Sequence, residues 1–165
     1  MKTIPLEQPA YPPPSTPLIA RPPGNVRYAV IHHTGGAIDE SPLAIDEFER
    51  RNFIGGPYAM IPYERLIYPN RIVAGRPLDD ESGATFGENA DSVALCCVGN
   101  YELNEPSDTL IKTLIIALVN IHLLIPSIID THGHCDVDAT ACPGKFLYDR
   151  IPYIKSEVYR RLYTE

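Results

Sequence analysis

The stretch from Asp108 to Leu124 constrains the fold most strongly, because it reads as a helix that is apolar nearly all round. Such a helix presents no face to water and must be buried against other elements. Just before it, Ser92–Val98 reads as a buried strand that Gly99 and Asn100 close. A buried strand followed by a buried helix indicates a layered α/β fold, with a central sheet covered by helices.

Other segments alternate between strand and helix in the same way. Val26–Ile31 is rich in β-branched and aromatic residues, which predicts a strand. Ser41–Pro42 reads as the start of a helix that Gly55 and Gly56 end. The apolar stripe of this helix is expected at Leu43, Ile45, Phe48 and Phe53. The remaining expected elements are short strands at 57–62, 65–69 and 128–129 and a closing helix at 153–162. We find no internal repeat and expect a single domain.

Proline sets the first part of the chain apart, since residues 1–24 hold eight of the 17 prolines. Such a segment is extended and polyproline-like and is not expected to build a sheet or a long helix. We therefore divide the chain into a proline-rich arm, residues 1–24, and a domain, residues 25–165. The arm either lies on the domain or moves freely, or it forms part of a substrate groove. Because it supplies little apolar core, we expect that residues 1–20 can be removed with the fold intact.

The charge balance excludes several classes of partner. Fourteen basic residues against 21 acidic ones give a net charge of −7, with no cluster of Lys and Arg. We therefore expect no nucleic-acid or membrane partner. The start of the chain lacks the features of a signal peptide, and the apolar run Leu114–Ile125 is too short to span a bilayer. Four cysteines without scaffold spacing fit synthesis in a reducing cytoplasm.

Ligand-capable side chains gather where the first and last predicted strands end. They are His32, His33, His132, His134, Asp136, Asp138 and Cys142. Loops beyond the strand ends of an open α/β sheet are where ligands bind. Histidine and a lone cysteine suit zinc, and three protein ligands leave a fourth position for catalytic water.

Several of these residues have simpler interpretations. His33 is expected to hydrogen-bond locally, and His132 faces opposite to His134 if that segment is extended. Asp136 or Asp138 either orients a ligand imidazole or is a solvated loop acid. Elsewhere, His122 is expected to be a core histidine. Cys96 and Cys97 are expected to pack as small apolar residues on opposite faces of the sheet.

Four stretches of the sequence, in order, resemble the type-2 N-acetylmuramoyl-L-alanine amidases, which include peptidoglycan recognition proteins and amidase-type phage lysozymes. They are Tyr28–Thr34, Gly56–Ile61, Asn89–Leu95 and Gly133–Gly144. The resemblance covers roughly residues 25–150, and the last stretch, GHCDVDATACPG, is the most specific.

The resemblance implies a mixed sheet flanked by helices, with one zinc ion in a surface cleft. By position, His32, His134 and Cys142 match the zinc ligands, and Tyr58 matches the catalytic tyrosine. Thr140 stands where the phage lysozymes carry lysine and the amidase-active recognition proteins carry threonine. The family reaction cleaves the amide between the lactyl group of N-acetylmuramic acid and the first L-alanine of the stem peptide.

The function expected from the resemblance is therefore a zinc-dependent peptidoglycan amidase, either a phage or prophage endolysin or a bacterial cell-wall enzyme. We expect a monomer that is made in the cytoplasm without a signal peptide and acts on the wall after release. Two alternatives stay open: a non-catalytic peptidoglycan-binding module, and a metal-independent cysteine hydrolase that uses Cys142 with His134 or His32 as base.

Overall fold

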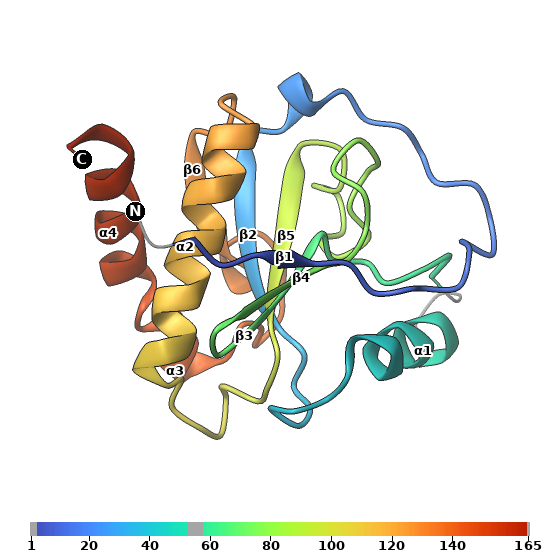
Figure 1. Cartoon of the computed structure of the whole chain (residues 1–165), viewed down its shortest axis with the longest axis horizontal. Helices are drawn as coiled ribbons and strands as arrows, with labels where there is room; N and C mark the ends of the chain where they lie inside the picture. The colour runs from blue at the N-terminus through green and yellow to red at the C-terminus, as the bar shows by residue number, and fades with distance from the viewer. Residues whose placement is uncertain (1–2, 53–57, 165) are drawn as a thin grey trace.

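The computed structural model describes residues 3–52 and 58–164, and six strands of these residues form one sheet (Figure 1). The strands are β1 (Leu6–Glu7), β2 (Tyr28–His33), β3 (Arg65–Tyr68), β4 (Arg71–Ala74), β5 (Ser92–Cys97) and β6 (Asp130–Gly133). The helices are α1 (Pro42–Asn52), α2 (Asp108–Leu124), α3 (Lys145–Tyr148) and α4 (Ile151–Tyr163), with 3-10 turns η1 (Pro23–Asn25) and η2 (His134–Asp136).

The sheet is mixed, as expected. Its strand order is β1-β4-β3-β5-β2-β6, and β3 and β4 form its antiparallel pair while the other neighbours run parallel. The central strands β2 and β5 are paired from Tyr28 and Ser92 to His33 and Cys97. Parallel strands place their carboxyl ends at one edge, so β2 and β6 deliver the residues that follow them to the same region.

Helices cover both faces of this sheet (Figure 1). Helices α2 and α4 pack on one face and enclose the larger core cluster, which includes Ile31 and Cys97. Helix α1 covers the other face, where a smaller cluster includes Ile45, Leu66 and Cys96. The single layered α/β domain is thus confirmed, and Cys96 and Cys97 do pack into cores on opposite faces.

The buried elements were predicted most accurately. Helix α2 has the expected bounds, and Ser107 caps its start by accepting a hydrogen bond from the Leu110 amide at 3.2 Å. The stripe expected on α1 is wrong: Ile45 is buried, but Leu43 and Phe48 are 50% and 57% exposed. Because α1 covers only the smaller cluster, one turn of the helix suffices for the contact. Phe53, Gly55 and Gly56 lie outside the described residues.

The short strands were predicted less well. Residues 58–62 are irregular, and the strand expected at 128–129 begins instead at Asp130. Strand β4 was not foreseen; a tight turn at Asn70, whose φ is +61°, folds it back on β3. The closing helix begins at Ile151 rather than at residue 153.

The arm lies along the domain over its described residues, 3–24 (Figure 1). The expectation that it builds no sheet is wrong for β1, which pairs in parallel with β4. Leu6 and Glu7 lie between Pro5 and Pro9, so their own amides remain free to pair. Further along, the Tyr11 hydroxyl donates to the Ala74 carbonyl at 2.9 Å.

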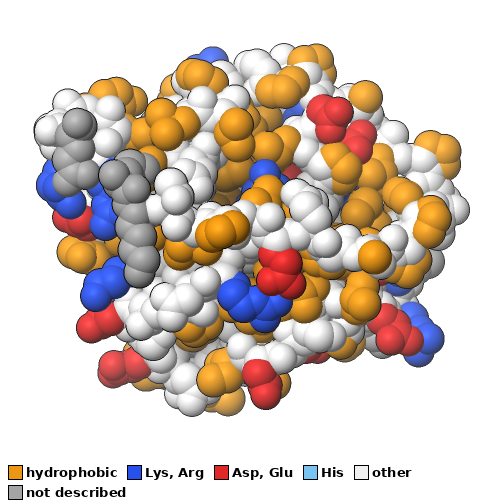
Figure 2. Space-filling model, viewed as in Figure 1, with side chains coloured by type: hydrophobic (Ala, Val, Ile, Leu, Met, Phe, Trp, Pro, Cys, Tyr) orange, Lys and Arg blue, Asp and Glu red, His pale blue; other side chains and the backbone are white. Residues whose placement is uncertain are grey.

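The surface mixes side chains of different kinds. On the face shown in Figure 2, hydrophobic side chains are interspersed with charged and uncharged polar ones. None of the helices within residues 3–52 and 58–164 is long and apolar enough to cross a bilayer.

Candidate metal centre and its cleft

His32 reaches the candidate site because side chains alternate along β2. Ile31 points into the larger core, so His32 lies on the opposite face of the sheet, opposite its register partner Cys96. The ring is buried, and its Nε2 lies 3.2 Å from the Thr85 hydroxyl oxygen. Its Nδ1 lies 3.7 Å from the Cys142 Sγ. Thr85 thus fixes the ring with Nδ1 directed toward the cysteine.

His134 and Cys142 are supplied by the loop that follows β6. The Asp136 carboxylate accepts a hydrogen bond from the Gly133 amide at 2.8 Å, which turns the chain out of the strand. The Cys135 amide then donates to the Cys142 carbonyl at 2.8 Å and closes the loop on itself. The loop therefore presents His134 and Cys142 side by side, although eight residues separate them.

The three predicted zinc ligands come together. One ligand atom each from His32, His134 and Cys142 lies within 4.8 Å of the others, and the two imidazole centroids are 4.3 Å apart. Two nitrogen donors and one sulfur donor form the ligand set that suits zinc. In addition, His134 Nε2 is buried and has no hydrogen-bond partner among the described residues. The residues present therefore fit a zinc ion.

The charge states of the cluster depend on burial. Desolvation lowers the pKa of His32 well below its ordinary value and also lowers that of His134, so both rings are neutral, as metal ligands must be. Burial raises the pKa of the Cys142 thiol to about 12. The His33 amide opposes this effect by donating to Sγ at 3.3 Å. Without a cation, the buried sulfur is thus a thiol; a bound metal ion would favour the thiolate.

A cleft of about 590 Å³ opens beside this cluster. His134 and Asp138 line it from the β6 loop, and Tyr58 lines it from the segment before β3. The Tyr58 side chain is half-buried, and desolvation together with the charge of Glu49 raises its pKa to about 12. The phenol therefore remains protonated at neutral pH and is able to donate a hydrogen bond into the cleft.

Thr140 lies in the loop between the two ligands. Its hydroxyl oxygen accepts a hydrogen bond from the Cys142 amide at 3.1 Å. The acceptor side of the hydroxyl is thereby used within the loop, which leaves its hydrogen for a second partner. Thr140 is thus adjacent to Cys142 both in sequence and in space.

The other candidate residues lie around this centre. Asp138 Oδ2 is 3.6 Å from His134 Nε2, whereas Asp136 holds the turn after β6 and accepts the Tyr148 hydroxyl at 2.6 Å. His33 Nδ1 accepts the Tyr101 amide at 3.0 Å, the local bond that was expected.

Two of the remaining histidines serve elsewhere in the structure. The His132 ring packs 5.2 Å from that of Tyr28, away from the ligand set. His122 is half-buried on α2, and burial lowers its pKa.

Three residues around His32 escaped the sequence analysis. Thr85 hydrogen-bonds its ring, as described above. The Tyr63 ring lies 5.6 Å from it, and the Tyr63 hydroxyl donates to Glu49 Oε1 at 3.1 Å. These residues come from loops and from α1, so no local periodicity links them to the histidine. A search for polar residues near the ends of neighbouring strands would have found Tyr63 but not Thr85.

Comparison with known proteins gives matches among solved structures. No family model and no curated protein matches the chain. The N-acetylmuramoyl-L-alanine amidase LysC of Clostridium intestinale URNW is 25% identical, with a TM-score of 0.78 over 97% of this chain and 98% of that one. The endolysin amidase LysCS of the same organism is 26% identical, with a TM-score of 0.76 over 95% and 94%.

An animal protein shares the same fold. Drosophila peptidoglycan recognition protein SD superposes with a TM-score of 0.80 over 90% of this chain and 94% of that one, at 21% identity. Together with the sheet order and the clustered ligand motif, these matches confirm the resemblance that the sequence indicated. The chain is a member of the structural family that comprises N-acetylmuramoyl-L-alanine amidases, endolysins and peptidoglycan recognition proteins.

Proposed function

We propose that this protein is a zinc-dependent amidase that cleaves the bond between N-acetylmuramic acid and L-alanine in peptidoglycan. The observation that carries the proposal is the meeting of His32, His134 and Cys142 beside a cleft lined by Tyr58, although His32 and Cys142 are 110 positions apart in the chain. The names of LysC and LysCS as N-acetylmuramoyl-L-alanine amidases support this assignment.

The reaction needs help because water is a poor nucleophile and the amide resists attack. A zinc ion held by the three residues would polarise the carbonyl and lower the pKa of water. The chain prepares this site in advance: Thr85 fixes the ring of His32, and the His33 amide stabilises negative charge on the Cys142 sulfur. Such supporting contacts orient ligands and are typically worth about 10- to 100-fold in metal affinity.

Tyr58 and Thr140 are the proposed hydrogen-bond donors. As the carbonyl is attacked, its oxygen gains negative charge, and a donor already aimed at it lowers the barrier by roughly 3–4 kcal/mol. Tyr58 remains protonated because its pKa is about 12. The Thr140 hydrogen is available because the oxygen, not the hydrogen, is used to bind the Cys142 amide.

The proposed substrate is peptidoglycan or a soluble muropeptide, and the proposed role is that of a phage or prophage endolysin or a bacterial wall amidase. A neighbouring structure, that of the recognition protein pair LCa and LCx, contains tracheal cytotoxin, and a mutant of Drosophila PGRP-LB is also in complex with it. These complexes support a muropeptide as the ligand for this fold. We propose that residues 25–165 carry the site, with the arm packed against them, and that the protein acts as a monomer.

The cysteine-hydrolase alternative is disfavoured by the surroundings of Cys142. A nucleophilic cysteine needs an accessible thiol with a lowered pKa. Here burial raises the pKa of the thiol to about 12, and His32, the base it would need, is buried and bonded to Thr85.

The zinc content of the purified protein tests the proposal. We expect one zinc ion per chain by elemental analysis, loss of peptide release from purified wall after chelation, and recovery when zinc is added back. Cys142→Ala should lose both the metal and the activity. Cys135→Ala, a neighbouring cysteine outside the ligand set, should keep both.

Two other results would redirect the assignment. Full activity in a metal-free preparation would overturn the zinc proposal in favour of cysteine chemistry. Bound zinc and tight muropeptide binding without any peptide release would instead assign the protein to the non-catalytic binding modules.

A further inference from the structure

The arm forms one side of the cleft next to the metal centre. Pro17, Leu18 and Ile19 line the same cavity as Tyr58 and His134. This stretch is fixed by backbone bonds to the loop before β5: Glu81 donates its amide to the Ile19 carbonyl at 2.8 Å, and Ala20 forms an antiparallel bridge with Asp80. We call Pro17–Ile19 the arm wall.

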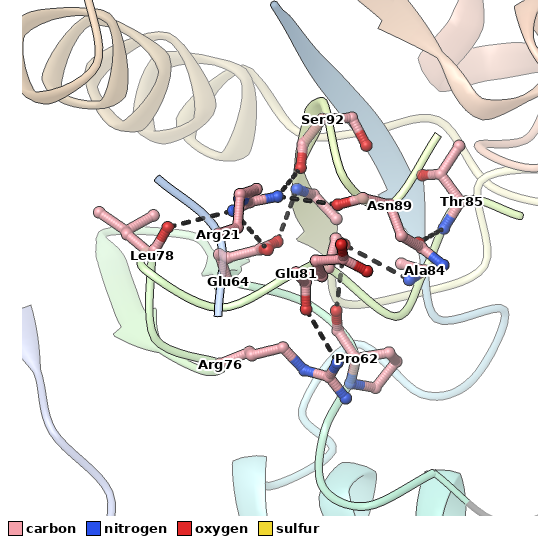
Figure 3. Close-up of polar contacts among 12 residues, drawn as sticks. Arg21, Pro62, Glu64, Arg76, Leu78, Glu81, Ala84, Thr85, Asn89 and Ser92 are labelled. Atoms are coloured by element: carbon pink, nitrogen blue, oxygen red, sulfur yellow. Dashed lines mark hydrogen bonds and ion pairs between the residues drawn. The ribbon is translucent and has the colours of Figure 1, made fainter. Parts of the chain in front are cut away.

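Arg21 locks the arm wall in place from below (Figure 3). Its side chain is almost completely buried and forms an ion pair with Glu64 at 3.3 Å. It also donates to the carbonyls of Leu78 at 3.2 Å, Asn89 at 2.9 Å and Ser92. One guanidinium therefore ties the arm to the start of β3, the start of β5 and the loop between β4 and β5.

The same loop connects the arm to the metal centre. The Asn89 side chain accepts a hydrogen bond from the Thr85 amide at 2.9 Å, and the Thr85 hydroxyl contacts His32. Arg21 on the Asn89 carbonyl, Asn89 on Thr85 and Thr85 on His32 form one continuous chain of hydrogen bonds. The arm wall is thus held at a fixed position relative to the candidate ligands.

The chemistry of the cleft selects among parts of the substrate. Ile19 is 65% exposed and Phe86 is 86% exposed, so the lip of the cleft presents uncovered apolar groups. The charged groups that line it are Arg76, Glu81 and Asp138. Arg76 already donates to the backbone carbonyls of Met60, Ile61 and Glu81. Two carboxylates therefore face the cleft against one engaged guanidinium.

Such a surface disfavours the acidic stem peptide and favours a neutral ring with an apolar face. We propose that the arm wall and Phe86 bind the sugar side of the substrate, an N-acetylated pyranose adjoining the scissile amide. This inference rests on the proposed function and adds a specificity-determining role for Ile19 and Phe86. The proline-rich arm is then part of the binding site rather than an appendage.

Binding measurements on the full chain test the inference. The variants are Ile19→Ser and Phe86→Ser, with Ile129→Ser as control, because Ile129 is 62% exposed and lies outside the cleft. The probes are an N-acetylglucosamine tetramer, a disaccharide-tetrapeptide and the free tetrapeptide. We expect each lip variant to weaken binding of both sugar-containing probes by roughly five- to tenfold, with unchanged zinc content and melting temperature. Binding of the free tetrapeptide and all properties of Ile129→Ser should remain as in the wild type.

The outcomes separate this inference from the proposed function. Lip variants that bind both sugar-containing probes as tightly as Ile129→Ser does would overturn the sugar assignment, even if the wild type releases peptide from wall. Weaker binding of the free tetrapeptide instead would place the stem peptide on the arm wall and likewise overturn it. A wild type that binds sugar through the lip but never releases peptide would sustain the inference and refute the proposed activity.

Discussion

At the residue scale, Tyr58 allows binding to be separated from catalysis. Tyr58→Phe keeps the ring and removes the donor, so zinc content and melting temperature should stay near those of the wild type. We expect kcat to fall by about 10²- to 10³-fold, as for loss of one preorganised donor. Thr140→Ala should lower kcat less, because its hydroxyl is less rigidly held than a phenol on a packed ring.

Steady-state kinetics on purified wall fragments check this prediction. An unchanged kcat in Tyr58→Phe would leave zinc or Thr140 as the oxyanion's partner. Loss of zinc from Tyr58→Phe would make the tyrosine a structural support of the centre.

Glu64 makes the stability depend on pH. It is fully buried, and desolvation raises its pKa from 4.5 to about 7, although Arg21, the Ala94 amide and Arg76 favour the charged form. Between these values the folded state keeps a proton that the unfolded chain releases, so the free energy of unfolding falls as pH rises. The integrated loss is about 3 kcal/mol.

Denaturant unfolding at a series of pH values measures this effect. Glu64→Gln keeps an acceptor for Arg21 but cannot titrate, so its stability should vary less between about pH 4.5 and 7 than that of the wild type. Parallel curves for the two proteins would mean that Glu64 is charged throughout this range.

Individual residues were predictable where a motif named them and not where only the fold brings them together. His32, His134 and Cys142 were found through motif spacing, and the structure clusters them. Thr85 and Arg21 had no such signal, because each acts through loop and backbone contacts set by distant parts of the chain. A side chain that bonds to carbonyls leaves little trace in the sequence.

At the element scale, the loop after β6 depends on Gly144. Its φ is +89°, and a Cβ at this position would overlap the backbone of Tyr101 and Glu102. Gly144→Ala should therefore lower the free energy of unfolding by roughly 2–4 kcal/mol and weaken zinc binding, because the strain falls two residues after Cys142.

A glycine elsewhere provides the control for this prediction. A Cβ added at Gly24 would meet no atom within 4 Å, and Gly24 has no positive φ, so Gly24→Ala should change stability by no more than about 0.5 kcal/mol. Thermal melts and zinc titrations of both variants measure the difference. Equal stability of Gly144→Ala and Gly24→Ala would show that the loop adapts.

Elements were predictable in proportion to their burial. Helix α2 and strand β5 lie in the larger core, where apolar pattern and structure must agree. Helix α1 buries one turn, so its stripe was misassigned, and β4 depends on a turn at Asn70 that carries no glycine or proline. Strand β1 was hidden because two pairing residues stand between prolines.

At the scale of the whole molecule, the net charge of −7 should oppose approach to walls that carry anionic polymers. Raising the ionic strength from about 10 mM to about 150 mM shortens the screening length from about 30 Å to about 8 Å. We therefore expect binding to intact anionic walls to strengthen over this range. Hydrolysis of a small soluble muropeptide should change little.

Co-sedimentation with walls, and kinetics on the soluble fragment, test this expectation together. Walls stripped of their anionic polymers serve as the control and should bind equally well at both salt concentrations. Binding to intact walls that weakens with salt would mean that local positive charge, rather than the net charge, governs the encounter.

The separation of His32 from Cys142 along the chain also bears on how the protein is made. While the ribosome is still translating residues before Cys142, the first histidine has been synthesised but its sulfur partner has not. The central pairing of β2 with β6 must likewise wait for the last strand. Long-range pairing of this kind slows folding. The nascent chain therefore cannot assemble the complete set of three candidate ligands until translation is nearly finished, and any metal uptake that needs all three must follow synthesis.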